Sequence, residues 1–175
     1  MKTQVKIYVG TYAKYNDGSI KGDWFDLADY SDAAELMEAV RQFHDDEEEP
    51  EFMIQDIDTE HKFIRNAIAE SMSEDELPEL YDKIEAMENS YLDIDVFDAY
   101  SKAFGYSLGE IKVSDVEDAY SGEYESDEAF AEETAEQCGY EIPNQWPFRC
   151  IDWEYAAREL MWDYTEQNGH YFRNC

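Results

Sequence analysis

Basic residues are scarce in this 175-residue sequence, which has 13 Lys and Arg against 44 Asp and Glu. The formal net charge at pH 7 is −31, whereas a small domain normally carries a net charge of magnitude about 2 to 8. Such a charge repels nucleic acids and anionic membrane surfaces, and it opposes compaction by self-repulsion. We therefore expect no nucleic acid and no membrane as a partner, and we expect the charge itself to serve the function.

Cysteine is also rare, and long apolar runs are missing. The three cysteines, Cys138, Cys150 and Cys175, are odd in number and widely spaced, with no CxxC pair. This pattern argues against a disulfide framework and predicts reduced thiols. No run of 18 apolar residues is present, and we expect no secretory signal. The sequence thus predicts a cytoplasmic protein.

Motifs of catalysis and cofactor binding are missing too. The sequence has no GxxxxGK[ST], GxGxxG or GxSxG, and His44, His61 and His170 form no HExxH pair. We expect these histidines to be surface or boundary residues. Paired carboxylates are too numerous for one pair to stand out as a general acid and base. Cys138 lies in an acidic segment, which disfavours a nucleophilic thiolate. The sequence therefore predicts neither an enzyme nor a cofactor.

A calcium loop is the obvious metal site to consider. Asp93, Asp95 and Asp98 resemble the start of such a loop. The glycine expected at loop position six and the glutamate expected at position twelve are missing. We therefore predict no metal site.

Apolar and aromatic residues, in contrast, are plentiful at 43% and 15% of the sequence. A disordered chain is usually poor in both, so we expect a folded protein. Val5, Ile7 and Val9 alternate with polar residues, which predicts a first strand at residues 5–9. The pattern further predicts a turn at 16–18, a return strand at 22–27, a helix from Ser31 or Asp32 to about 43 with Glu35 in a capping box, and a third strand at 51–57.

The rest of the chain is predicted to be mainly helical. Helices are expected at 62–72, at 73–87 with a capping pattern in SEDE, at 94–104, at 115–122, at 126–139 between Ser126 and Gly139, and at 153–169. A short strand or turn near 106 and a last strand at 170–175 complete the prediction. The fold class is α+β, with a sheet-plus-helix domain at residues 1–61, a helical central domain at 62–105 and a C-terminal α+β domain at 106–175.

The acids are distributed along the whole chain. Residues 23–60 contain 15 acids and one base, residues 66–101 contain 11 and one, and residues 113–141 contain 11 and none. Duplex DNA carries one charge per ~1.7 Å, so 31 net charges match ~50 Å or on the order of 15 base pairs. All 44 acids match roughly 75 Å, on the order of 22 base pairs. A string of small units reaches this length, whereas a sphere of 175 residues does not.

These carboxylates suit a highly acidic surface that imitates the phosphates of DNA. The acid run at 45–49 falls between a predicted helix and a predicted strand, so it is a loop on a folded unit and not a disordered tail. The candidate phosphate-mimicking acids lie in this loop and its flanking strand, and in the predicted C-terminal domain. They are Asp45, Asp46, Glu47, Glu48, Glu49, Glu51, Asp56 and Asp58, and Asp115, Glu117, Asp118, Glu123, Glu125, Asp127, Glu128, Glu132, Glu133 and Glu136.

Two other interpretations of the acidity stay open. One is a salt-adapted protein, and the other is a chaperone-like protein that binds basic DNA-binding proteins. A salt-adapted fold should lose structure at low salt, whereas a mimic should stay folded and bind its partner less tightly as salt rises.

Three segments carry a resemblance to a known family. They are IYVGTYAKYNDGSIKGDWFDL, EFMIQDID and EIPNQWPFRCIDWEYAARELMWDY, and they resemble, in order, segments of the ArdA family of antirestriction proteins. The matching residues are Tyr8, Lys14, Tyr15, Asn16, Gly18, Gly22 and Trp24 in the first, Phe52, Ile54 and Asp56 in the second, and Pro143, Ile151, Asp152, Tyr155, Arg158 and Leu160 in the third.

The resemblance implies a function and a shape. ArdA proteins come from mobile genetic elements, are not enzymes, and inhibit Type I restriction-modification enzymes by occupying their DNA-binding groove. The family fold is an elongated, curved chain of three small domains that forms a homodimer. The family's antirestriction segment corresponds here to residues 127–141 and is expected near the dimer contact.

Overall fold

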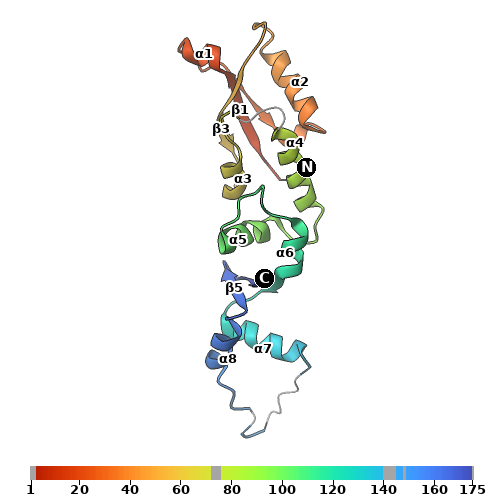
Figure 1. Ribbon diagram of the computed structural model, residues 1–175, viewed down its shortest axis with the longest axis vertical. Coiled ribbons are helices and arrows are strands. Elements are labelled where there is room, and N and C mark those ends of the chain that lie inside the picture. Colours follow the sequence, from red (N-terminus) through yellow and green to blue (C-terminus); the bar gives the residue numbers. More distant parts are fainter. Residues whose placement is uncertain (1–2, 72–75, 140–144, 148, 175) are drawn as a thin grey trace.

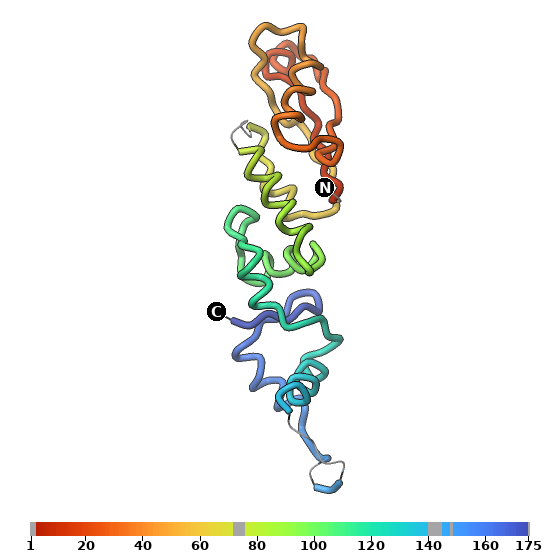
Figure 2. Tube along the Cα trace, turned by 90° about the vertical axis from the view of Figure 1, so that its right-hand side faces the viewer, coloured from red at the N-terminus to blue at the C-terminus, as the bar shows by residue number. Residues whose placement is uncertain are grey.

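The computed structural model describes residues 3–71, 76–139, 145–147 and 149–174. The molecule is elongated, with residues 6–58 toward one end and residues 127–137 and 153–160 toward the other (Figures 1 and 2). The described residues form eight α-helices, one short 3₁₀ helix and two three-stranded antiparallel sheets. This mixed α and β content agrees with the predicted fold class. No helix among the described residues has the length and apolar character needed to cross a bilayer.

The first sheet has the strand order β2-β1-β3. The central strand β1 (Lys6–Thr11) pairs antiparallel with β2 (Asp23–Asp26) and with β3 (Phe52–Asp58). Val5, Ile7 and Val9 are at most 3% exposed, so the predicted alternation is confirmed. The helix α2 (Ala33–Phe43) packs beside this sheet and buries Leu36 and Val40 (Figure 1).

Local hydrogen bonds explain where the first helices begin. Asp32 Oδ1 accepts from Glu35 N at 2.9 Å, so Asp32 caps α2 as predicted. Glu35 Oε2 accepts from Ser31 N at 2.7 Å, one residue before the cap, which is a variant of the predicted capping box. A short helix, α1 (Tyr12–Asn16), precedes the predicted turn and was not expected from the sequence. Thr11 caps it by accepting from Lys14 N at 3.3 Å.

The middle of the molecule is helical, as predicted, but one helix is shorter than expected. It contains α3 (Lys62–Ala67), α4 (Glu76–Glu88), α5 (Ile94–Phe104) and α6 (Val113–Ala119). The helix predicted at 62–72 ends at Ala67, because Ile68 is extended and the Glu70 carbonyl accepts from Ile54 N at 2.8 Å. Pairing with the backbone of β3 thus replaces further helical turns. Most of the predicted SEDE cap lies outside the described residues.

The C-terminal part differs most from the prediction. β4 (Tyr120–Glu123), β5 (Tyr164–Gln167) and β6 (His170–Arg173) form the second sheet in the order β4-β6-β5, beside α7 (Asp127–Gln137) and α8 (Trp153–Leu160). The helix predicted at 153–169 is wrong beyond Leu160. Asn168 and Gly169 both have positive φ, 55° and 83°, and connect β5 to β6 in a tight hairpin.

Two further predictions in this region have mixed outcomes. The helix predicted at 115–122 changes to strand at Tyr120, because Tyr120 pairs with Phe172 of β6. The predicted ends of the next helix are confirmed. Ser126 Oγ accepts from Ala129 N at 3.2 Å, and Gly139 follows the helix with φ 78°.

One cluster of buried residues extends from Val5 through Ala119 and includes Phe172. It crosses both positions at which the sequence predicted domain boundaries, 61/62 and 105/106. Tyr81 in α4 donates a buried hydrogen bond to the carbonyl of Leu27 at 3.1 Å, in the 3₁₀ helix η1 (Leu27–Asp29). The division into three domains stays a prediction, but all three predicted units contribute residues to this one cluster.

We expect this shared core to make residues in different predicted domains unfold together. Leu36→Ala and Ile84→Ala each truncate a side chain that is 0% exposed, so each should lower the free energy of unfolding by about 2–5 kcal/mol. Ile20→Ala is the matched control, because Ile20 is 75% exposed. Urea unfolding followed by far-UV circular dichroism should show one transition that shifts in both core variants. Two separate transitions, each sensitive to one variant only, would contradict the shared core.

Candidate functional site

The candidate acids occupy two stretches far apart along the molecule. One comprises the loop after α2 and the strand β3, and the other comprises α6, β4 and α7 (Figure 1). All the candidates are exposed except Glu47 and Glu117, which are half-buried. Most of these carboxylates are therefore accessible to a partner.

The loop at residues 45–49 does not point all its acids outward. The Lys14 ammonium lies 2.7 Å from Asp46 Oδ1 and 2.7 Å from Glu47 Oε1. Lys21 Nζ is 3.0 Å from the other Asp46 oxygen, and Thr11 Oγ1 donates to Glu47 Oε1 at 2.7 Å. Two of the predicted phosphate mimics are thus neutralised by lysines of the same molecule. We call Thr11, Lys14, His44, Asp46 and Glu47 the Lys14 cluster.

His44 is not the surface or boundary residue that the sequence predicted, because it is 0% exposed. Its Nδ1 lies 2.9 Å from Lys14 Nζ, and its Nε2 lies 3.3 Å from the Val9 carbonyl oxygen. An ammonium can only donate, so Nδ1 accepts and Nε2 carries the proton that is donated to Val9. The rings of Phe43 and Phe52 pack against the imidazole at 4.9 and 5.9 Å between centroids.

The cluster lowers the pKa values of both its carboxylates and of its histidine. Hydrogen bonds from Lys14 and Lys21 lower the pKa of Asp46 to about 2. Hydrogen bonds from Lys14 and Thr11 lower the pKa of Glu47. Burial lowers the pKa of His44, and the Lys14 charge adds to this effect. At neutral pH the cluster therefore combines one ammonium, a neutral imidazole and two carboxylates.

Three members of the cluster could also be metal ligands. One ligand atom from each of His44, Asp46 and Glu47 lies within 4.8 Å of the other two. The Lys14 ammonium is within 2.9 Å of all three residues, so it occupies the position that a metal ion would take. The calcium-like aspartates lie instead at the start of α5, where Asp95 contacts His61 at 3.5 Å and Asp98 pairs with Lys102.

The second stretch of acids has a different electrostatic character. Among the described residues, no Lys or Arg forms an ion pair with its ten candidates. Four of them accept hydrogen bonds from neutral side chains: Asp115 from Ser114 at 3.3 Å, Glu117 from Ser90 at 2.7 Å, Asp127 from Tyr171 at 2.7 Å and Glu133 from Gln137 at 3.0 Å. Their negative charge therefore stays uncompensated at the surface.

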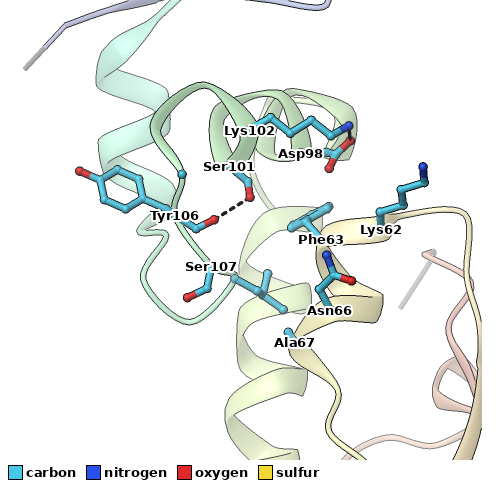
Figure 3. Close-up of a pocket in the computed structure, with 11 residues that line it drawn as sticks. Lys62, Phe63, Asn66, Ala67, Asp98, Ser101, Lys102, Tyr106 and Ser107 are labelled. Carbon is cyan, nitrogen blue, oxygen red and sulfur yellow. Dashed lines mark hydrogen bonds and ion pairs between the residues drawn. The ribbon is translucent and has the colours of Figure 1, made fainter.

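A pocket of about 450 Å³ lies between α3 and α5. Figure 3 shows Lys62, Asn66 and Lys102 around it. Two interactions among its polar residues hold the chain: Asp98 pairs with Lys102, and Ser101 Oγ donates to the Tyr106 carbonyl at 2.6 Å. The lining residues provide no nucleophile next to a base, so the pocket has none of the features of a catalytic site.

The amino-acid sequence matches a known protein family over most of its length. The sequence model described as "Antirestriction protein (ArdA)" matches residues 7–172, nearly the whole chain. The protein belongs to the ArdA family. No curated protein matches it. The family assignment confirms the resemblance seen in the sequence and implies an antirestriction function.

Sequence reasoning missed the Lys14 cluster. In the sequence, Lys14 stands out only through the family resemblance, and His44 is predicted to be a surface or boundary residue. Asp46 follows Lys14 by 32 residues and Lys21 by 25, and no spacing rule connects residues so far apart. The apolar residues on both sides of His44 in space, Val9 and Phe52, also come from different strands. Only the folded chain brings these groups together.

We expect His44 to make stability depend on pH between 7.5 and 5. The folded pKa of His44 is lowered, so the unfolded chain takes up a proton below its ordinary pKa of about 6.5 while the folded chain resists it. The stability that neutral His44 contributes is therefore present above pH 6.5 and lost as pH falls toward the folded pKa. Asp46 and Glu47, whose pKa values are lowered, lose their contribution only below about pH 4.

The measurement compares the wild type with His44→Gln, which cannot titrate. The difference in free energy of unfolding between them, from urea titrations, should be larger at pH 7.5 than at pH 5. A difference that stays constant over this range would show that burial and the Lys14 charge do not hold His44 neutral.

Proposed function

We propose that this protein is a DNA mimic that inhibits Type I restriction-modification enzymes by occupying their DNA-binding groove. The observation that carries the proposal is the series of exposed carboxylates without paired bases along an elongated molecule. Membership of the antirestriction family supports the same conclusion. The mimic acids proposed are the outward residues of both stretches, with Asp46 and Glu47 serving the Lys14 cluster.

The mechanism follows from charge and shape. Carboxylates on helices and loops take the positions of phosphates and pair with Lys and Arg in the groove of the enzyme. Attraction between the acidic protein and a basic groove accelerates association and weakens with salt. Phosphate contacts carry no sequence information, so inhibition should not depend on the recognition sequence of the enzyme. The protein acts by binding, without catalysis, cofactor or metal.

We further propose that the protein works as a cytoplasmic homodimer of curved, three-domain subunits. Large apolar residues near the α8 end are exposed: Trp162 by 79%, Trp146 by 76%, Tyr155 by 57% and Ile151 by 38%. Large exposed apolar side chains are a feature of protein contact surfaces where they form one patch, and these four supply the residues for such a patch. A second copy at this end would extend the row of carboxylates and cover these side chains.

A competition titration tests the proposal. A Type I restriction-modification enzyme is mixed with a short labelled duplex that contains its site, and this protein is added at two salt concentrations. Stoichiometric displacement that weakens with salt is the expected result. A salt-adapted protein would instead gain structure with salt and displace nothing, and circular dichroism at both concentrations separates these cases. A chaperone-like protein would bind unrelated basic proteins equally well.

We expect binding energy to be distributed over many carboxylates. A single exposed ion pair contributes about 0.2–1 kcal/mol, so Glu133→Gln alone should weaken inhibition by less than about fivefold. The triple change Glu132→Gln, Glu133→Gln and Glu136→Gln should weaken it by about tenfold or more. The matched control is Glu79→Gln, Asp82→Asn and Glu85→Gln on α4, which removes the same charge from exposed acids outside both stretches.

The two triple variants distinguish a mimic surface from bulk charge. If α7 contributes to the mimic surface, its triple variant loses more affinity than the α4 control. Equal losses would mean that net charge alone determines binding. Loss of all inhibition by the single change would contradict the distributed mechanism.

A further inference from the structure

The loop at residues 45–49 has an inner and an outer layer. Asp46 and Glu47 contact the lysines of the same chain, whereas Asp45, Glu48 and Glu49 are exposed and form no ion pair with any described residue. The backbone closes the loop on both sides, since Glu47 N donates to the His44 carbonyl at 3.1 Å and Tyr12 N donates to the Glu51 carbonyl at 3.0 Å. The outer carboxylates therefore project from a loop with fixed ends.

Lys14 lies at the centre of this arrangement. Its side chain is 13% exposed, and its ammonium has three acceptors: His44 Nδ1 at 2.9 Å, Asp46 Oδ1 at 2.7 Å and Glu47 Oε1 at 2.7 Å. An ammonium has three hydrogens to donate, so all of them are used. His44 is itself anchored to β1 through the Val9 carbonyl. Lys14 thus connects the inner layer of the loop to the first sheet.

We infer that Lys14 is a positioning residue for partner binding, which holds Asp45, Glu48 and Glu49 in place as phosphate mimics. Lys21 supports it through the second oxygen of Asp46. The inference rests on the proposed function. Without Lys14, the inner and outer carboxylates repel one another, and the loop must be ordered when the partner binds. Ordering flexible side chains at an interface reduces affinity.

The inference and simple charge attraction predict effects of opposite sign. Replacing Lys14 by an uncharged residue makes the protein more negative by one charge. If attraction to a basic groove depended on net charge alone, this change would strengthen binding. If Lys14 positions the outer carboxylates, the same change weakens binding although the protein carries more negative charge.

The experiment is the competition titration with Lys14→Met and with Lys62→Met as the matched control. Lys62 is exposed and forms no ion pair with any described residue, so its replacement changes the charge equally without affecting the loop. We expect Lys14→Met to bind the enzyme with an affinity about tenfold lower than that of the wild type. We expect the affinity of Lys62→Met to equal or exceed that of the wild type. Displacement by Lys14→Met that equals or exceeds that of Lys62→Met would overturn the inference.

Two further measurements keep the test decisive. The slope of log affinity against log salt should be shallower for Lys14→Met, because fewer ionic contacts form, whereas partial unfolding would reduce only the active fraction. If circular dichroism shows that Lys14→Met does not fold, Lys21→Gln replaces it, because Lys21 is 49% exposed and its replacement disturbs the fold less. The affinity of Lys21→Gln for the enzyme should be lower than that of Lys62→Gln. Equal affinities would overturn the inference. If the wild type itself displaces no duplex, the proposed function fails instead.

Discussion

Mutual repulsion among carboxylates is the constraint on which the rest of this structure depends. A chain with 44 acids and 13 bases cannot neutralise itself, and a compact shape would bring its charges closer together. The elongated arrangement separates the acids along one long axis (Figures 1 and 2). Some of the few bases are used within the fold: Lys83 donates to the Ile111 carbonyl at 2.6 Å, and Lys14 joins three groups of the loop cluster.

Apolar packing must offset this repulsion in a narrow molecule. Aromatic residues contribute much of the contact near the C-terminal sheet, where Phe130 stacks on Tyr171 with centroids 4.4 Å apart and Phe172 packs against Tyr100 at 5.4 Å. Because large rings bury much area per residue, they suit a core that is only a few side chains wide. The same core holds the strands and helices that carry the acids, so the surface charge lies on ordered elements.

Elements whose signal is local could be predicted from the sequence. Alternation of apolar residues identified β1, and the pair Asp32 and Glu35 identified the start of α2, because neighbouring residues alone decide these features. Predictions failed where pairing with a distant strand decided the outcome. Glu70 was predicted to be helical, but its carbonyl accepts a hydrogen bond from Ile54 N of β3. Tyr120 was also predicted to be helical, but it pairs with Phe172 of β6. The hairpin at Asn168 and Gly169 had a local signal, but the helical pattern before it was extended too far.

The sequence by itself determined the acidity, the lack of catalytic motifs and the family, since composition and the order of motifs are properties of the linear chain. It also placed the acid run in a loop between a helix and a strand. Only the tertiary structure decided which of those acids face outward. Lys14 of α1 and Lys21, which precedes β2, both approach Asp46 in the folded chain. Ion pairs depend on distance in space, whereas a sequence specifies only separation along the chain.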